Sequence, residues 1–299
     1  MLPWYDGFQE SFHEVNGTRL LVRTGGRAGG PPLLLLHGFP QTSACWEPVA
    51  RLLKDRFALV VPDLRGYGRS AKPPDAPDHA QASKRAMAAD LVALMQALGH
   101  PRFDLAGHDR GGRVAHRLAL DHPGALRRLC VLDVAPTLDM YAATSFDFAR
   151  AYYHWFHLIQ PAPLPERMIQ ADARHYLHTK LGGWGGQGVG FIAPAALAEY
   201  ERCFCTPEAI HAACEDYRAS AGVDLEHDRA SRAAGEKVAC ELLVLWGERG
   251  VVHRLFDPLA LWTAQCSATV TGRTLPTGHF LPEEAPEATA AALADFFGG

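Results

Sequence analysis

The chain lacks any apolar run close to the roughly 20 residues that a membrane helix needs. Its first residues, MLPWYDGFQESF, also lack the basic region and the apolar region of a signal peptide. These two absences exclude a membrane protein from the expected classes. We therefore expect no membrane partner and a cytoplasmic location.

An excess of charge of one sign is also missing. The net charge is −4, and the 29 basic and 33 acidic residues are scattered along the chain. Without a basic surface, nucleic acid is not an expected partner. The seven cysteines lack the spacing of a zinc site, because the C-x-C of Cys203 and Cys205 is too tight and no second pair completes it. We expect small buried cysteines in a reducing compartment and no metal.

The first part of the chain alternates strand patterns with helix patterns. Residues 12–26 are typical of a hairpin with Asn16 and Gly17 at its turn, and PLLLLHG is typical of a buried parallel strand. Apolar residues at helical spacing predict a helix over 81–98 that ends at Gly99. Further strands are expected within 57–62, 102–109 and 126–136, and a further helix within 111–123. This alternation predicts a parallel sheet covered on both faces.

The pattern changes after Pro136. Residues 137–236 are rich in aromatics and histidines, suggest several helices and contain the glycine-rich stretch 181–190, without a comparable strand. Strand patterns resume at 240–247 and 267–274, and a helix is expected over the last residues, 283–299. The sequence therefore predicts an α/β core domain of residues 1–136 and 237–299 with an inserted helical cap domain of residues 137–236.

The segment AGHDRGGR places an aspartate where many hydrolases of this design carry a serine nucleophile. Gly107 and Gly111 flank Asp109 and allow the tight strand-to-helix turn that exposes such a side chain. Asp133 ends the next strand, and His279 lies in a late loop. Nucleophile, acid and histidine thus follow the chain order of the α/β-hydrolase fold.

An aspartate nucleophile performs different chemistry from a serine. The carboxylate of Asp109 needs no deprotonation and attacks saturated carbon, which forms an ester. His279 would then activate water to hydrolyse that ester, with Asp133 as its orienting partner. Backbone N–H groups of Phe39 and Arg110 are candidates for an oxyanion hole. The alternative interpretation is that Asp109 only caps the helix that follows it.

Two arginines and several cap side chains suggest what the nucleophile attacks. Arg110 and Arg113 border Asp109 on neighbouring helix faces, and a guanidinium pair suits a small anionic substrate. The alternative is that they are surface arginines paired with acids. A departing halide needs converging hydrogen-bond donors, for which His154, Trp155 and Tyr217 are candidates. The alternative is that these aromatics belong to the core of the cap.

The sequence resembles the fluoroacetate dehalogenases, which are haloacid-cleaving members of the α/β-hydrolase fold. The resemblance covers nearly the whole chain and is carried by LLLLHGFPQT, KRAMA, LAGHDRGGRV, LDVAPT, YYHW, QPAPLPE, CEDYRA, EHD and GHFLPEEAP. It implies a mostly parallel sheet flanked by helices, an inserted helical cap, no cofactor and a homodimer. It also implies roles for matching residues: Asp109, His279 and Asp133 as nucleophile, base and acid; Arg110 and Arg113 as carboxylate-binding residues; His154, Trp155 and Tyr217 as halide-binding residues; and Trp184 near the pocket.

A few features depart from this pattern or lie outside it. Arg65 and Arg69 add charge to the loop after residue 62, and the stretch 181–190 around the pocket tryptophan is richer in glycine than expected. Either feature could alter substrate entry or dimer contacts. His37 and His108 are expected to be structural rather than catalytic.

The resemblance predicts hydrolysis of haloacetates, such as fluoroacetate to glycolate and fluoride, with a small-molecule haloacid as the only partner besides a second subunit. An epoxide hydrolase is the nearest rival, although that class usually has tryptophan in place of Arg110 and takes its acid after a later strand. Glu248 or Asp257 could supply that acid here. A haloalkane dehalogenase has no use for two arginines. A non-catalytic binding protein would not need the whole catalytic set.

Overall fold

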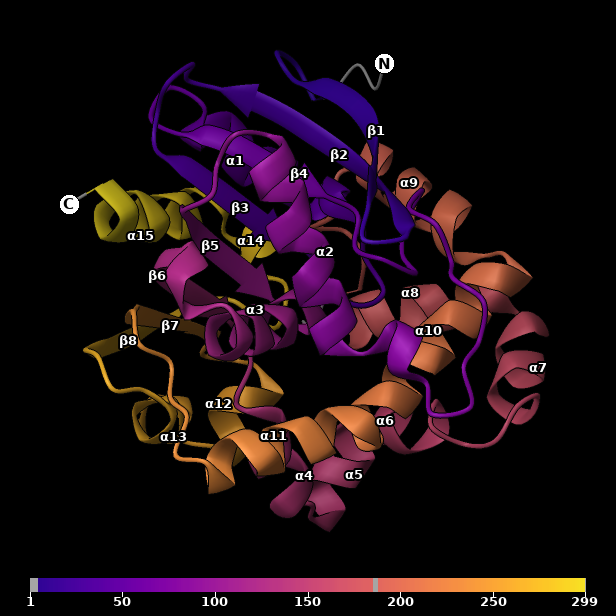
Figure 1. Cartoon of the computed structure of the whole chain (residues 1–299). Coiled ribbons are helices and arrows are strands. Elements are labelled where there is room, and N and C mark those ends of the chain that lie inside the picture. Colours follow the sequence, from indigo (N-terminus) through magenta and orange to yellow (C-terminus); the bar gives the residue numbers. More distant parts are fainter. Residues whose placement is uncertain (1–4, 185–187, 299) are drawn as a thin grey trace.

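A computed structural model describes residues 5–184 and 188–298 (Figure 1). Eight strands form one sheet in the order β1-β2-β4-β3-β5-β6-β7-β8. Strand β2 is antiparallel to both its neighbours, and all other neighbours pair in parallel. The strands are β1 Gln9–Val15, β2 Thr18–Gly26, β3 Pro32–Leu36, β4 Ala58–Pro62, β5 Phe103–His108, β6 Leu126–Leu132, β7 Glu241–Gly247 and β8 Val270–Leu275.

The first two strands form the predicted hairpin. Val15 pairs with Thr18, so only Asn16 and Gly17 make the turn. Both turn residues have positive φ, 46° and 73°, which is the conformation that a two-residue turn needs to match the twist of its strands. The hairpin forms the antiparallel edge of the sheet.

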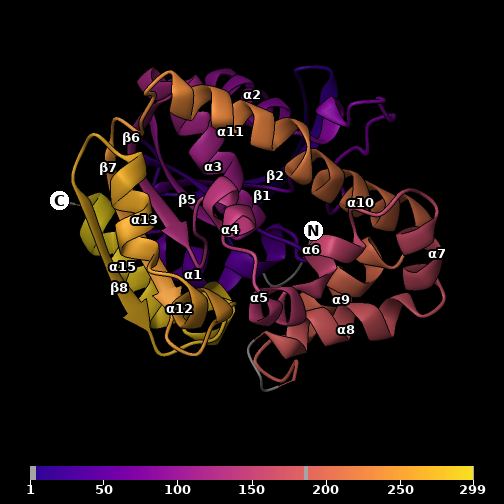
Figure 2. The same cartoon turned by 90° about the horizontal axis from the view of Figure 1, so that it is seen from below.

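Helices cover both faces of the sheet, which explains why β3 carries apolar residues along its whole length. Leu33 to Leu36 of β3 are fully buried. Helices α1 (Glu47–Leu53) and α15 (Pro286–Gly298) pack together on one face, and α2 (Lys84–Ala97) and α3 (Arg110–Asp121) on the other (Figure 2). Two short helices, α12 (Val251–Leu255) and α13 (Pro258–Gln265), join β7 to β8.

The ends of the helices follow local sequence signals. Ser83 accepts a hydrogen bond from the backbone of Ala86 and caps α2, and Gly99, with φ of 81°, follows its end. The expected C-terminal helix over 283–299 is wrong in its extent. The chain makes a short helix α14 (Leu281–Glu284), and α15 begins at Pro286, because proline lacks the N–H that a continuous helix would use there.

Eight helices lie between β6 and β7, and within the described residues this segment contains no strand. They gather at one side of the sheet in both views (Figures 1 and 2), and we call them the cap helices. They are α4 Thr137–Ala142, α5 Phe146–Ala151, α6 Tyr153–His157, α7 Leu164–Gln170, α8 Ala173–Gly183, α9 Pro194–Phe204, α10 Pro207–Ala221 and α11 Val223–Ala233. The division into two domains stays a prediction. Residues 185–187 of the glycine-rich stretch lie outside the described part of the chain.

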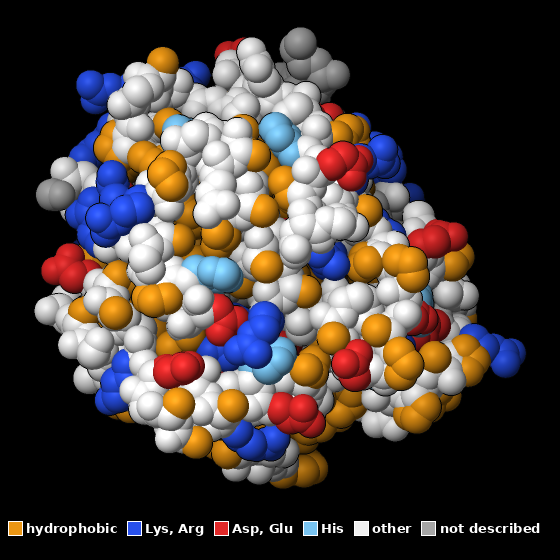
Figure 3. Space-filling view, viewed as in Figure 1, with side chains coloured by type: hydrophobic (Ala, Val, Ile, Leu, Met, Phe, Trp, Pro, Cys, Tyr) orange, Lys and Arg blue, Asp and Glu red, His pale blue; other side chains and the backbone are white. Residues whose placement is uncertain are grey.

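The surface agrees with the balanced composition. Acidic and basic side chains are interspersed on the face shown in Figure 3.

Among the described residues, no helix combines the length and the apolar character that spanning a bilayer requires. All seven cysteines are free, and five of them are buried, as expected for small apolar residues.

The two additional arginines of the loop after β4 are both paired with acids. Arg65 is buried and binds both carboxylate oxygens of Asp90, at 2.6 Å each. Arg69 pairs with Glu10 of β1. These contacts tie the loop to neighbouring core elements, so both side chains have a structural use.

Candidate active site

The predicted nucleophile lies on a sharp turn between β5 and α3. Asp109 has φ of 47° and ψ of −114°, an unfavourable conformation for a residue with a side chain. The turn is possible because two glycines allow backbone segments to approach each other closely. A Cβ atom added to Gly107 would lie 2.5 Å from the carbonyl oxygen of Gly111, and a Cβ atom added to Gly111 would lie 2.6 Å from the carbonyl oxygen of Leu36. The Asp109 side chain makes no capping hydrogen bond to α3, which leaves it free to point into the site.

The three predicted catalytic side chains lie together at the carboxyl ends of the core strands. Nδ1 of His279 is 2.6 Å from Oδ2 of Asp133, whose Oδ1 accepts a hydrogen bond of 3.1 Å from the backbone of Gly247. Nε2 of His279 lies 3.8 Å from Oδ2 of Asp109 and has no hydrogen-bond partner in the described structure. Asp133 also has a positive φ, 48°, which is incompatible with a continuing strand. Strand β6 therefore ends at Leu132, before the end of the segment 126–136 in which it was predicted.

The protonation of the triad follows from burial and mutual charge. Burial opposes the charged form of Asp109, but His279, His108, Arg113 and Arg110 outweigh it and lower the pKa of that carboxyl. Burial also lowers the pKa of His279, yet its hydrogen bond to Asp133 and the charges of Asp133 and Asp109 outweigh burial and raise that pKa. The site therefore holds an ionised Asp109 beside a histidine of increased basicity.

The two carboxylate oxygens of Asp109 have different surroundings. The backbone N–H of Phe39 donates a hydrogen bond of 2.9 Å to Oδ1. The described structure gives no corresponding bond from the backbone of Arg110. Oδ2 is the oxygen nearer His279, and Asp109 is only 8% exposed. One oxygen is thus held by the backbone while the other is available for attack.

Arg110 and Arg113, in the first turn of α3, are both buried but differ in their partners. Nε of Arg110 donates to Oδ2 of Asp216 at 2.6 Å, and its Nη2 donates to Oγ of Ser220 at 2.9 Å. Its guanidinium also lies over the ring of Tyr217, 4.1 Å from the centroid. Most of the donors of Arg110 are therefore occupied by cap helix α10.

Arg113 has no acidic side chain as a salt-bridge partner among the described residues. Its Nη1 donates to Oγ1 of Thr137 at 2.9 Å, and its buried Nε has no partner. Its guanidinium lies over the ring of Trp155, 4.6 Å from the centroid. Burial, together with the charge of Arg110, lowers its pKa, which is the sign of a cation that lacks compensation.

The cap contributes a cluster of rings above Asp109. His154 lies 4.6 Å from Trp184 and 5.5 Å from Tyr217 between ring centroids, and Trp184 lies 5.3 Å from His279. Nδ1 of His154 is buried without a partner, and burial, with nearby cations, holds the pKa of this imidazole well below its usual range. His154 is therefore a neutral donor or acceptor facing the catalytic residues.

Trp155 is placed differently from its neighbour. Its ring packs against Tyr141 at 4.7 Å and Phe148 at 5.3 Å, in addition to its contact with Arg113. The hydroxyl of Tyr141 is buried without a partner and its pKa is raised to about 12, mainly by burial. Sequence reasoning missed Tyr141, because a lone tyrosine in a short helix carries no signal.

Sequence reasoning also missed the buried charge network behind Arg110. Asp216 accepts hydrogen bonds from Arg110 and, at 2.6 Å, from the hydroxyl of Tyr67, and it pairs with Lys84 of α2. Lys84 also lies 3.4 Å from Asp224 of α11. The segments KRAMA and CEDYRA, which contain Lys84 and Asp216, were the available signal. This network joins cap helices to core helices and fixes the position of Arg110.

The two core histidines expected to be structural have structural contacts. Nε2 of His37 accepts the backbone N–H of Leu64 at 3.0 Å. Nε2 of His108 bonds the backbone oxygen of His279 at 2.8 Å, which supports the loop that carries the candidate base. Burial lowers the pKa of His108 to about 3, so it is neutral.

The fold is that of the α/β hydrolases, and the family model described as "alpha/beta hydrolase fold" matches residues 31–181. The chain is 44% identical to a fluoroacetate dehalogenase from a Burkholderia species over 98% of this chain and 94% of that one. It is 32% identical to a soluble epoxide hydrolase from Corynebacterium sp. strain C12, over 91% of each chain. An α/β hydrolase from Nostoc sp. PCC 7120 has a similar crystal structure, with 49% identity, a TM-score of 0.94 and coverage of 98% of this chain and 99% of that one. The chain is a hydrolase, and it belongs to the α/β-hydrolase family that includes the fluoroacetate dehalogenase.

Proposed function

We propose that the protein hydrolyses the carbon–halogen bond of haloacetates, with fluoroacetate giving glycolate and fluoride. The observation that carries this proposal is Arg113, a buried cation without an acidic partner beside the ionised Asp109. A buried guanidinium that forms no salt bridge is costly, and a substrate carboxylate would provide the missing ion pair. The higher identity to the fluoroacetate dehalogenase, 44% against 32% to the epoxide hydrolase, supports the same substrate class.

In the first step, Oδ2 of Asp109 attacks the carbon that carries the halogen. The carbon–halogen bond breaks, the halide leaves with the bonding electrons, and an ester forms on Asp109. Arg113 and the remaining donor of Arg110 hold the substrate carboxylate and offset its repulsion from Asp109. Donors from His154, Trp155 and Tyr217 stabilise the charge that develops on the halide.

In the second step, His279 takes a proton from water, and the resulting hydroxide attacks Cγ of the ester. The tetrahedral intermediate collapses, the bond between Cγ and the original Oδ2 breaks, and glycolate departs with that oxygen and with the proton of the attacking hydroxide. His279 then releases its own proton to solvent. The backbone N–H of Phe39, which holds Oδ1, stabilises the oxyanion. Esterification removes one of the negative charges that raise the pKa of His279. The pKa of His279 should therefore fall when the ester forms, which shifts the imidazole toward the neutral form that acts as the base.

The epoxide hydrolase alternative lacks the acid expected after the later strand. The side chain of Glu248 is 49% exposed, and Asp257 accepts a hydrogen bond from the backbone of Ala260 at the start of α13. Neither contacts His279, whose partner is Asp133. A non-catalytic binding protein would not require His279 to lie between Asp133 and Asp109.

Ion-selective measurement of fluoride released from fluoroacetate tests the proposal, with chloroacetate and styrene oxide as parallel substrates. We expect fluoride and chloride, but little diol. Diol without halide would favour the epoxide hydrolase, and the absence of all three products would favour the binding protein. A single turnover in heavy-oxygen water should label Asp109, and direct labelling of glycolate would overturn the aspartyl ester. The homodimer and the cytoplasmic location stay predictions.

A further inference from the structure

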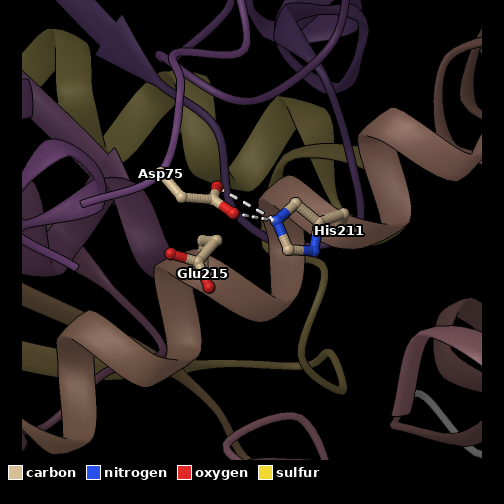
Figure 4. Close-up of side chains that lie close together, drawn as sticks. All are labelled: Asp75, His211 and Glu215. Atoms are coloured by element: carbon tan, nitrogen blue, oxygen red, sulfur yellow. Dashed lines mark hydrogen bonds and ion pairs between the residues drawn. The ribbon is translucent and has the colours of Figure 1, made fainter. Parts of the chain in front are cut away.

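A second cluster of ionisable side chains lies at the seam between the core and the cap, on a different face of α10 from the one that carries Asp216. Asp75 belongs to the core loop between β4 and α2, whereas His211 and Glu215 lie one turn apart on α10. Their ligand atoms, two carboxylate oxygens and one imidazole nitrogen, all lie within 4.8 Å of one another. Figure 4 shows Asp75 facing the His211 ring, with Glu215 beside them.

The His211 ring is held between two carboxylates, one on each ring nitrogen. Its Nδ1 is 3.0 Å from Oε1 of Glu166 on α7, and its Nε2 is 3.0 Å from both carboxylate oxygens of Asp75. A carboxylate on one ring nitrogen is the usual second-shell arrangement that directs the other nitrogen toward a metal. Glu166 is buried, so this orientation is fixed from inside the cap.

The formal charges in direct contact leave an excess of negative charge. Asp75, Glu166 and Glu215 contribute three carboxylates, and Arg218 contributes one guanidinium, with its Nη1 2.7 Å from Glu166 and 2.9 Å from Glu215. Because both ring nitrogens of His211 bond carboxylates, the imidazole counts as a cation in this arrangement, and one negative charge remains. A divalent cation that displaced the proton on Nε2 would face two negative charges and compensate them. Nδ1 of His79 lies 2.8 Å from Oε2 of Glu215 and is a nearby additional nitrogen.

The cluster also has space around it for solvent ligands. Two surface cavities, of about 550 Å³ and about 200 Å³, share Asp75, His211 and Glu215 in their linings. A metal ion here could complete its coordination with water. The side chain of Asp75 is 59% exposed, so it can turn toward an ion without disturbing the core.

We propose that Asp75, His211 and Glu215 bind a divalent transition-metal ion, with Zn²⁺ the best match to one imidazole and two carboxylates. Zinc bonds to such ligands are about 2.0 to 2.2 Å long, so the cluster must contract slightly around the ion. The ion would link the loop before α2 to cap helix α10, which also carries Tyr217. This proposal does not depend on the reaction that the enzyme catalyses.

Calorimetric titration of the chelator-treated full-length protein with Zn²⁺, together with the absorption spectrum of its Co²⁺ form, tests the site. We expect one ion to bind per chain, with weak visible bands and without the intense near-ultraviolet band of cysteine ligation. His211→Ala and Asp75→Asn should each weaken binding by more than about 100-fold. Glu166→Gln changes a residue that orients His211 without binding the ion, and it should weaken binding about 10-fold. Unfolding temperatures measured in chelator would show that the exposed Asp75→Asn variant is folded.

His175→Ala is the matched control, because His175 is an exposed histidine on another cap helix, α8. It should leave Zn²⁺ affinity unchanged. Absence of saturable binding to the unmodified protein would overturn the site. Binding that survives both His211→Ala and Asp75→Asn, or a cobalt spectrum with a thiolate band, would place the metal elsewhere and would overturn it equally.

Discussion

Asp109 and Asp133, at the ends of two adjacent core strands, are positioned by their own backbones, whereas the cap side chains opposite them are positioned by distant partners. Both aspartates have positive φ and follow a strand directly. His154 and Tyr217 instead come from helices α6 and α10 and meet through ring packing. The comparison indicates that the core half of the site is set by local geometry and the cap half by tertiary contacts.

The charged groups of both halves have hydrogen-bond partners from distant parts of the chain, but these partners differ in kind. In the core, Asp133 is fixed by a backbone N–H of β7 and by His279. At the border with the cap, Arg110 is fixed by Asp216, which Lys84 and Tyr67 hold in turn. A substitution in the core half should therefore stop one chemical step, and a substitution in the cap half should alter binding and stability together.

The largest effect is expected from His279→Ala. Asp109 can still attack the substrate, but water is not activated, so the ester should accumulate while turnover falls by about 10⁴-fold or more. Intact-protein mass spectrometry after mixing with chloroacetate should show the adduct. Asp109→Asn should show no adduct, and rapid turnover by His279→Ala would contradict the assigned base.

Substitution of Arg113 tests whether the core half of the site binds the substrate carboxylate. Arg113→Met removes the buried cation, and kcat/KM for haloacetates should fall by about 10²-fold or more. Arg113→Lys should recover only part of this loss, because the ammonium cannot form a bidentate pair. A haloacetamide, which has no carboxylate, provides the internal control. An equal loss on the acid and the amide would mean that Arg113 has only a structural role.

Asp216→Asn tests the cap half of the site, where tertiary contacts hold Arg110 in place. Because it leaves Lys84 and Arg110 buried beside a neutral group, we expect a loss of about 3 kcal/mol in the free energy of unfolding. KM should rise about 10-fold, with a smaller change in kcat, because Arg110 is no longer held in place. The control is Asp139→Asn, in an exposed pair with Arg232 2.7 Å away. It should cost at most about 1 kcal/mol, and an equal cost for both variants would contradict the network.

The same comparison explains what the sequence could predict. The order of strands and helices, the elbow around Asp109 and the predicted triad depend on local patterns and chain order. The described structure has this order in outline and brings Asp109, Asp133 and His279 together, while their catalytic roles stay predictions. Asp216, Lys84 and Tyr141 could not be assigned from spacing. Asp216 and Lys84 meet because helices far apart in the chain bring their charges together, and Tyr141 meets Trp155 through the packing of two separate cap helices. Periodicity contains no information on such pairs. For the same reason, the sequence could not predict that Arg110 pairs with an acid while Arg113 does not.

Glu283 is a further contact between core and cap, with the smallest expected effect. This buried carboxyl of α14 accepts a hydrogen bond of 2.9 Å from the hydroxyl of Tyr200 on cap helix α9 and is also bonded to Gln41. Burial raises its pKa from 4.5 to about 8. The native state therefore holds this proton more tightly than the unfolded chain, so the stability from this group is complete at low pH and is lost as pH rises toward about 8.

Glu283→Gln should remove this pH dependence, because the amide has no proton to lose. Measured by chemical denaturation from about pH 6 to about pH 9, the variant should gain at least about 1 kcal/mol relative to the natural protein as pH rises. Glu287→Gln, an exposed change of the same charge on α15, should show no such trend. If the two variants follow the same pH curve, Glu283 is ionised in the native protein. The contact with Tyr200 would then resemble the charged network around Asp216 rather than a neutral hydrogen bond between core and cap.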